Sequence, residues 1–137
     1  MKVLFLLISL CLSLSAFSAE DKSTDAKEDA KVEVKYYRLY PDFVTNLKSK
    51  DKKHYVLVRI EVAAKGDKAI QQVKDNEALI RDKLILLFNN KTVAEVSRGK
   101  LRKNTKKQAL ELVQKTLKKE TGEPLVTNLL FTKFQVE

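Results

Sequence analysis

The chain has 137 residues, of which 44% are apolar and 33% are charged, and its formal net charge is +9. This composition, with only three Gly and two Pro, excludes collagen-like and wholly disordered chains and favours one folded domain. The single Cys excludes a disulfide scaffold. A chain with one His has few of the side chains that the site of a zinc enzyme or a serine hydrolase needs.

Residues 1–18 have the pattern of a secretory signal peptide, in which Lys2 precedes an apolar run that ends in small residues. Ala16 and Ser18 suit the positions before a signal peptidase site, so cleavage is predicted between Ser18 and Ala19. A cleaved signal predicts a periplasmic protein, and this location disfavours nucleic acid as a partner.

Two alternatives to cleavage exist. The first is a retained anchor, although residues 3–17 would form roughly 22 Å of helix against a hydrocarbon core of ~30 Å. The second is a lipoprotein signal, although Leu10 stands before Cys11, where lipid attachment favours a small residue.

Charge changes sharply along the rest of the chain. Residues 19–35 are rich in acids and lysines and poor in apolar side chains, which predicts a flexible, solvated linker. Residues 98–119 hold nine basic residues against Glu111 alone. This basic stretch is either a solvated helix face or a surface that attracts phospholipid head groups, an envelope polymer or an acidic protein.

Two strands are predicted at the start of the folded part. Residues 36–44 are an extended segment that Pro41 interrupts, which indicates a bulge or an edge position. Residues 54–62 alternate between mixed and aliphatic side chains, so one face of this strand packs against a core. The polar segment 48–53 between them is short, which favours an antiparallel hairpin.

Two helices are predicted next. Apolar residues at helical spacing predict one long helix over residues 68–88, with Asp67 as its cap and an Asn pair at 89–90 ending it. Thr92 and Glu95 have the spacing of a capping box, in which each side chain satisfies a free backbone amide. We therefore expect a short second helix to follow.

A second capping-box spacing at Thr105 predicts a third helix over residues 105–119. Arg102 and Lys106 fall near the apolar arc of this helix, which conflicts with an amphipathic pattern. Either the helix starts only at Thr105, or these two side chains face a partner.

The last segment, residues 125–136, is predicted to be a strand. Strict alternation places Leu130, Thr132, Phe134 and Val136 on one side and Leu129, Phe131, Lys133 and Gln135 on the other. The order of elements predicts a single-domain α+β fold. In it, an antiparallel sheet of three or more strands is covered on one face by one long and one or two shorter helices.

The sequence holds no strong catalytic or ligand-binding motif. His54 lacks partners at metal-ligand spacing, and Glu77 and Arg81 are spaced as a surface ion pair on a helix. No Gly-rich phosphate loop or nucleophile elbow occurs, so we expect no enzyme, no cofactor, no metal and no small-molecule substrate. A pocket that joins two of four titratable residues would reverse this expectation: His54, Glu61, Asp75 and Asp82.

Four short stretches resemble, in order, the motifs of one protein family. They are residues 40–47 (YPDFVTNL), 54–58 (HYVLV), 79–85 (LIRDKLI) and 131–136 (FTKFQV). In this order and spacing they resemble the first strand, second strand, long helix and closing strand of the flagellar basal-body-associated FliL family. The resemblance covers most of residues 36–137.

The resemblance implies a periplasmic domain with a stomatin-like (SPFH-like) fold. It implies that copies of the domain form a ring around the flagellar stator, the ion-driven torque unit, near the inner membrane. There they would support stator assembly or output without catalysis. By analogy, Arg81 and Asp82 would fix the helix or a subunit contact. Phe43, Asn46 and Leu47 would lie where the domain meets its linker and its neighbours.

Two functions follow as hypotheses. The first is a non-catalytic flagellar component that oligomerises and contacts the stator and basal body, with partner contacts at Arg102, Lys103, Lys106 and Lys107. The second is a soluble periplasmic module that docks on anionic lipid or polymer through residues 98–119. High salt should weaken docking of the second kind and leave apolar contacts between copies intact.

Overall fold

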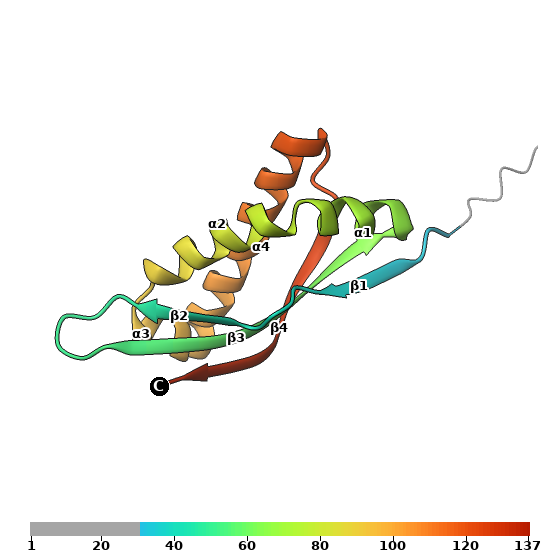
Figure 1. Ribbon diagram of the computed structural model, residues 1–137. Helices are drawn as coiled ribbons and strands as arrows, with labels where there is room; N and C mark the ends of the chain where they lie inside the picture. Colours follow the sequence, from blue (N-terminus) through green and yellow to red (C-terminus); the bar gives the residue numbers. More distant parts are fainter. Residues whose placement is uncertain (1–30) are drawn as a thin grey trace, which may run out of the picture. The chain divides into compact units, whose positions relative to one another are not determined.

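The computed structural model describes residues 31–137, so the predictions for the signal peptide, its cleavage site and most of the linker lie outside it. The described residues confirm the predicted α+β fold, with one four-stranded antiparallel sheet and helices packed on it (Figure 1). In chain order the elements are β1 (Val34–Arg38), β2 (Phe43–Leu47), β3 (His54–Lys65), α1 (Gly66–Asp75), α2 (Glu77–Asn89), α3 (Val93–Ser97), α4 (Gly99–Thr121) and β4 (Val126–Val136).

β3 is the centre of the sheet and pairs antiparallel with each of the other three strands. β4 occupies one edge of β3 from Val56 to Ala64, so β1 and β2 share the opposite edge, one after the other. The pairing of β2 with β3 confirms the predicted hairpin. The extended segment predicted over residues 36–44 is instead two strands, because β1 ends at Arg38 and β2 begins at Phe43, with Pro41 in the connection between them.

β4 does not alternate strictly, because two register shifts interrupt its pairing with β3. Thr127 and Thr132 are left without a partner in β3 at these shifts, as happens in a β-bulge. Each bulge moves the residues beyond it to the other face, so Leu129 and Phe131 share the core side with Phe134. The predicted division of this strand into two faces was wrong for that reason.

The single long helix predicted after β3 is instead two helices, α1 and α2, separated at Asn76. The side-chain amide of Asn76 donates to the carbonyl of Gln72 at 2.8 Å, a local bond that competes with helical backbone bonding. Glu77 follows the break, and its carboxylate accepts hydrogen bonds from Tyr37 Oη at 2.6 Å and Tyr40 N–H at 3.0 Å. The break therefore directs Glu77 toward the end of β1.

The helix starts were predicted with mixed success. The capping box of α3 is confirmed, because Glu95 N–H donates to Thr92 Oγ1 at 3.3 Å and Thr92 N–H donates to Glu95 Oε2 at 2.8 Å. The prediction that Asp67 caps α1 was wrong, since Asp67 lies inside the first turn and pairs with Lys35 Nζ at 2.7 Å. The prediction that α4 starts at Thr105 was also wrong.

Thr105 is a buried residue in the middle of a longer helix, because α4 already begins at Gly99. Its hydroxyl lies 3.2 Å from the carbonyl of Leu101 and 3.3 Å from the carbonyl of Glu95. The second of these bonds joins α4 to α3. Thr105, whose sequence pattern is that of a helix N-cap, therefore joins α3 to α4.

The helices pack on one face of the sheet and leave the other face open. The covered face supplies the buried side chains Phe43, Val58, Ile60 and Leu129, each 1% exposed or less. α2 and α4 supply the opposing core residues Ile80, Leu84, Phe88, Val113 and Leu117. Within residues 31–137, no helix combines the length and apolar character that a bilayer crossing requires. We call the uncovered side of the sheet the open face.

Candidate partner-binding surfaces

The basic residues predicted as partner contacts lie on the first half of α4. A hollow of about 330 Å³ opens between this half and β4 and is lined by Gly99, Arg102, Lys103, Lys106, Leu130 and Phe131. The structure therefore brings three of the four predicted basic residues together beside two apolar side chains. The fourth, Lys107, pairs with Glu111 at 3.9 Å on the exposed side of α4. We call this concavity the α4–β4 hollow.

Arg102 is held by its own chain. Its Nε donates to the carbonyl of Val96 at 2.9 Å and its Nη2 donates to the carbonyl of Ser97 at 3.1 Å. These carbonyls lie in the last turn of α3, where a positive charge is favourable. The guanidinium also lies over the ring of Phe134, 4.7 Å from its centroid. The conflict between Arg102 and the apolar arc is thus resolved without a partner.

The rest of α4 offers more unpaired positive charge. Within residues 31–137, Lys107 is the one basic residue of the 98–119 stretch with an acidic partner within 4 Å. A second hollow of about 460 Å³, between α2 and α4, is lined by Leu79, Lys83, Leu112, Lys115, Thr116, Lys119 and Glu120. Both hollows on α4 therefore combine apolar side chains with lysines.

Arg81 and Asp82 are neighbours on α2 with different surroundings. The Arg81 guanidinium lies 4.2 Å from the centroid of the Phe43 ring, and its Nη1 donates to the carbonyl of Pro41 at 2.6 Å. Arg81 thereby attaches α2 to the start of β2. Asp82 is exposed, and it pairs with Lys83 Nζ at 3.8 Å.

The predicted ion pair from Glu77 to Arg81 is replaced by other contacts. Glu77 accepts from Tyr37 and Tyr40, whereas Arg81 donates to Pro41. The hydrogen bond to the Glu77 carboxylate, assisted by partial burial and by the negative charge, raises the pKa of the Tyr37 hydroxyl to about 12. These contacts fix α2 against β1 and β2.

The three residues predicted at a contact with the linker and neighbours all lie on β2. Phe43 and Leu47 are 1% and 5% exposed, so they anchor β2 in the core and offer no side-chain surface to a neighbour. Asn46 is exposed and pairs across the strands with Tyr55, which places both on the open face. Of the three, Asn46 alone has a side chain that a partner could touch.

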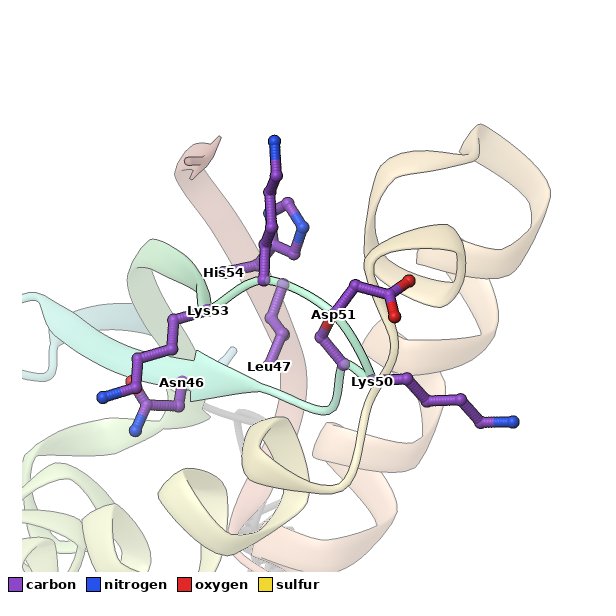
Figure 2. A pocket seen from close by; sticks show the side chains of 8 residues that line it. Asn46, Leu47, Lys50, Asp51, Lys53 and His54 are labelled. Carbon is purple, nitrogen blue, oxygen red and sulfur yellow. The ribbon is translucent and has the colours of Figure 1, made fainter.

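The connection between β2 and β3, predicted as a hairpin turn, is a basic loop. Beside one acid, Asp51, and the His54 at its end, it holds four lysines: Lys48, Lys50, Lys52 and Lys53. Figure 2 shows Lys50 and Lys53 projecting in different directions around a hollow of about 280 Å³. We call residues 48–54 the basic loop. The density of lysines in the sequence was the available signal for it.

A charge network on the open face was not predicted. The Asp42 carboxylate accepts hydrogen bonds from Arg59 Nε and Nη2, both at 3.1 Å, and from Arg38 Nη2 at 2.7 Å. The two bonds from Arg59 and the one from Arg38 lower the pKa of Asp42 to about 2. Because Arg38 ends β1 and Asp42 precedes β2, the network holds both strands to the middle of β3.

Exposed apolar side chains lie toward both ends of the sheet. Val34 and Tyr36 on β1 and Tyr40 just after it form one group, which we call the β1 patch. Val44 and Tyr55 form the other group, beside the basic loop. These five side chains are between 43% and 71% exposed. Large apolar side chains exposed in groups are typical of contact surfaces.

The four titratable residues that would have indicated an enzyme are dispersed. His54 lines the hollow of the basic loop, Glu61 lies opposite Arg38 on the open face, Asp75 ends α1 and Asp82 lies on α2. Within residues 31–137, no group of three or more His, Cys, Asp or Glu side chains is placed to hold a metal ion.

Comparison with known proteins identifies the family. A family model described as "Flagellar basal body-associated protein FliL" matches residues 36–136. The chain is also similar to a "Flagellar protein FliL" from Aquifex aeolicus (strain VF5), with 29% identity over 101 residues. This alignment covers 74% of the chain and 60% of the relative, so the chain spans about three fifths of that relative's length. The chain therefore belongs to the FliL family of flagellar basal body-associated proteins.

Proposed function

We propose that this protein is a non-catalytic component of the flagellar basal body, which assembles with further copies of itself and supports the stator. The observation that carries the proposal is the FliL match over residues 36–136, which spans nearly all of the described residues. A signal peptide over residues 1–18, followed by a charged linker, would place the domain, whose first strand begins at Val34, in the periplasm beside the inner membrane.

We assign self-association to the β1 patch. Its three side chains are exposed and largely apolar. Val34 and Tyr36 lie on the sheet side that no helix covers, and the guanidinium of Arg38 from that side lies 5.4 Å from the centroid of the Tyr40 ring. Burying such a surface between copies is favourable and insensitive to salt.

Replacing Tyr36 and Tyr40 by Ser is expected to shift the protein toward monomers in sedimentation velocity experiments. Leu86→Ser is the matched control, because Leu86 is an exposed apolar residue on α2, 49% exposed, away from the β1 patch. The assignment fails if the control dissociates the assembly equally, or if the double variant sediments like the parent protein.

Stator support is assigned to the α4–β4 hollow and the lysines around it. Charge reversal at Lys103, Lys106 and Lys107 is expected to reduce spreading in soft agar and the number of fluorescent stator units at each motor. Arg102 is left unchanged, since it holds α3 in place. Reversal at Lys115 and Lys119 is the control on the same helix. Motility and stator recruitment that both stay unchanged in the triple variant would refute the assignment.

A second candidate function is docking on an anionic envelope component through residues 98–119. The observation in its favour is the lack of acidic partners for most basic side chains of this stretch within the described residues. Rising ionic strength would release such a complex, whereas self-association through the β1 patch would persist.

A further inference from the structure

We propose that the basic loop, residues 48–54, docks on an anionic phospholipid surface, with Tyr55 and Val44 entering the head-group layer. The inference does not depend on the flagellar role proposed above. It concerns a different part of the molecule from the α4–β4 hollow and from the β1 patch.

The charge of the loop is available to a partner. All of residues 48–53 are exposed, and within residues 31–137 none of the four lysines lies within ion-pair distance of a carboxylate. Clusters of four or more basic residues attract anionic leaflets, because the contribution of each residue adds to those of the others. The basic loop holds four lysines in the single connection between β2 and β3.

The arrangement of the lysines favours an extended surface over a single bound ion. A site for one phosphate needs donors that converge on one point. Lys50 and Lys53 instead project in different directions (Figure 2). The loop also extends beyond the helices at one end of the sheet, with β1 at the other end (Figure 1). A flat surface can therefore approach the loop without meeting the helices.

Apolar side chains lie next to this charge. Tyr55 follows the loop directly and pairs across the strands with Asn46, while Val44 pairs with Leu57, so the four side chains share the open face. Val44 is 65% exposed and Tyr55 is 43% exposed. Tyrosine favours the interface of a membrane because its ring is apolar and its hydroxyl is polar. Protein segments that bind at the membrane interface combine basic charge with exposed apolar side chains.

The first test compares vesicle binding by the full-length protein and two triple variants. The vesicles are phosphatidylcholine with about one third phosphatidylglycerol, or phosphatidylcholine alone. Lys50, Lys52 and Lys53 are replaced by Gln in one variant. Lys65, Lys68 and Lys74, three exposed lysines at the far end of β3 and on α1, are replaced by Gln in the other, so both lose the same charge. Any contribution of the N-terminal 30 residues is common to all three proteins. Circular dichroism melting confirms that each variant is folded.

We expect the parent protein to bind the anionic vesicles and to be released when ionic strength rises from about 0.05 to about 0.5 M. The loop variant should bind about 100-fold more weakly, since three interfacial lysines are lost. The control variant with Lys65, Lys68 and Lys74 replaced should bind nearly as tightly as the parent. Equal losses in the two variants would overturn the proposal, because net charge alone would then explain binding.

The second test reports on the loop itself and does not depend on net charge. The chain contains no Trp, so Tyr55→Trp introduces a single indole beside the loop. Its emission should shift to the blue with anionic vesicles. Tyr36→Trp, at the other end of the open face, is the matched control and should not shift on vesicle addition. A shift in the control alone, or in neither variant, would overturn the proposal.

Two further experiments distinguish an anionic phospholipid surface from free phosphate and from an acidic protein. Inorganic phosphate, matched in ionic strength to chloride, should release no more protein from vesicles than chloride does. A larger release would indicate a discrete phosphate site and overturn the membrane assignment. Binding to poly-glutamate without binding to anionic vesicles would overturn it in favour of an acidic protein partner.

Discussion

Asp42 is the residue on which two arginines of the open face depend. Its pKa is lowered from an ordinary value of 3.8 to about 2 by the hydrogen bonds from Arg59 and Arg38. A carboxyl whose pKa is lower in the folded state stabilises that state while it is ionised. This stabilisation is complete above about pH 4 to 5 and is lost as the pH falls toward 2.

We therefore expect the unfolding free energy of the parent protein to fall more steeply between about pH 5 and 2 than that of Asp42→Asn. The variant should already be less stable at neutral pH, because the two arginines then lie close together without their counter-charge. Urea titrations at a series of pH values measure this. Asp82→Asn, at an exposed carboxyl, is the control, and parallel curves for the parent and Asp42→Asn would contradict the prediction.

Single residues were predictable where their role is local and unpredictable where it depends on distant elements. The sequence placed the charged Arg102 near the apolar arc of an amphipathic helix. Its contact with Phe134, however, depends on how the bulged strand β4 packs against α4. In the same way, Asp42 meets Arg59 only once β2 and β3 pair. Spacing along the chain carries no direct signal for such contacts.

The short helix α3 depends on its capping box. Thr92→Ala removes the hydroxyl that accepts the Glu95 N–H and should destabilise the protein by about 1 kcal/mol. Thr92→Ser keeps an acceptor at the same place, so its unfolding midpoint in urea should stay closer to that of the parent. Equal losses in the Ala and Ser variants would show that the methyl group, and not the cap, is responsible.

Elements were predicted well by type and order and less well by continuity. The periodic patterns located the central strand, the closing strand and the helical regions, since burial of one face imposes a period, but the extended segment predicted over residues 36–44 is two strands. They assumed unbroken elements, however, and so missed the interruption at Asn76 and the bulges at Thr127 and Thr132. The second capping-box spacing misled because Thr105 bonds to a carbonyl of the preceding helix.

At the scale of the whole molecule, the fold class and the family were both available from the sequence. The surfaces were not, because they depend on which face of the sheet the helices cover. Tyr36 and Tyr55 lie more than a dozen positions apart in the chain, yet they occupy opposite ends of one open face. The basic loop was visible as a lysine-rich turn, and its position at the far end of the sheet from β1 became visible only in three dimensions.

The central position of β3 has a consequence for how the molecule opens. Every other strand is attached to β3, and along most of its length both of its edges are occupied. Its amide hydrogens can therefore exchange with solvent only when the sheet as a whole comes apart. β1, in contrast, is attached along one edge and can detach by itself. The slowest-exchanging amides should thus trace a single strand, and the N-terminal edge should open first.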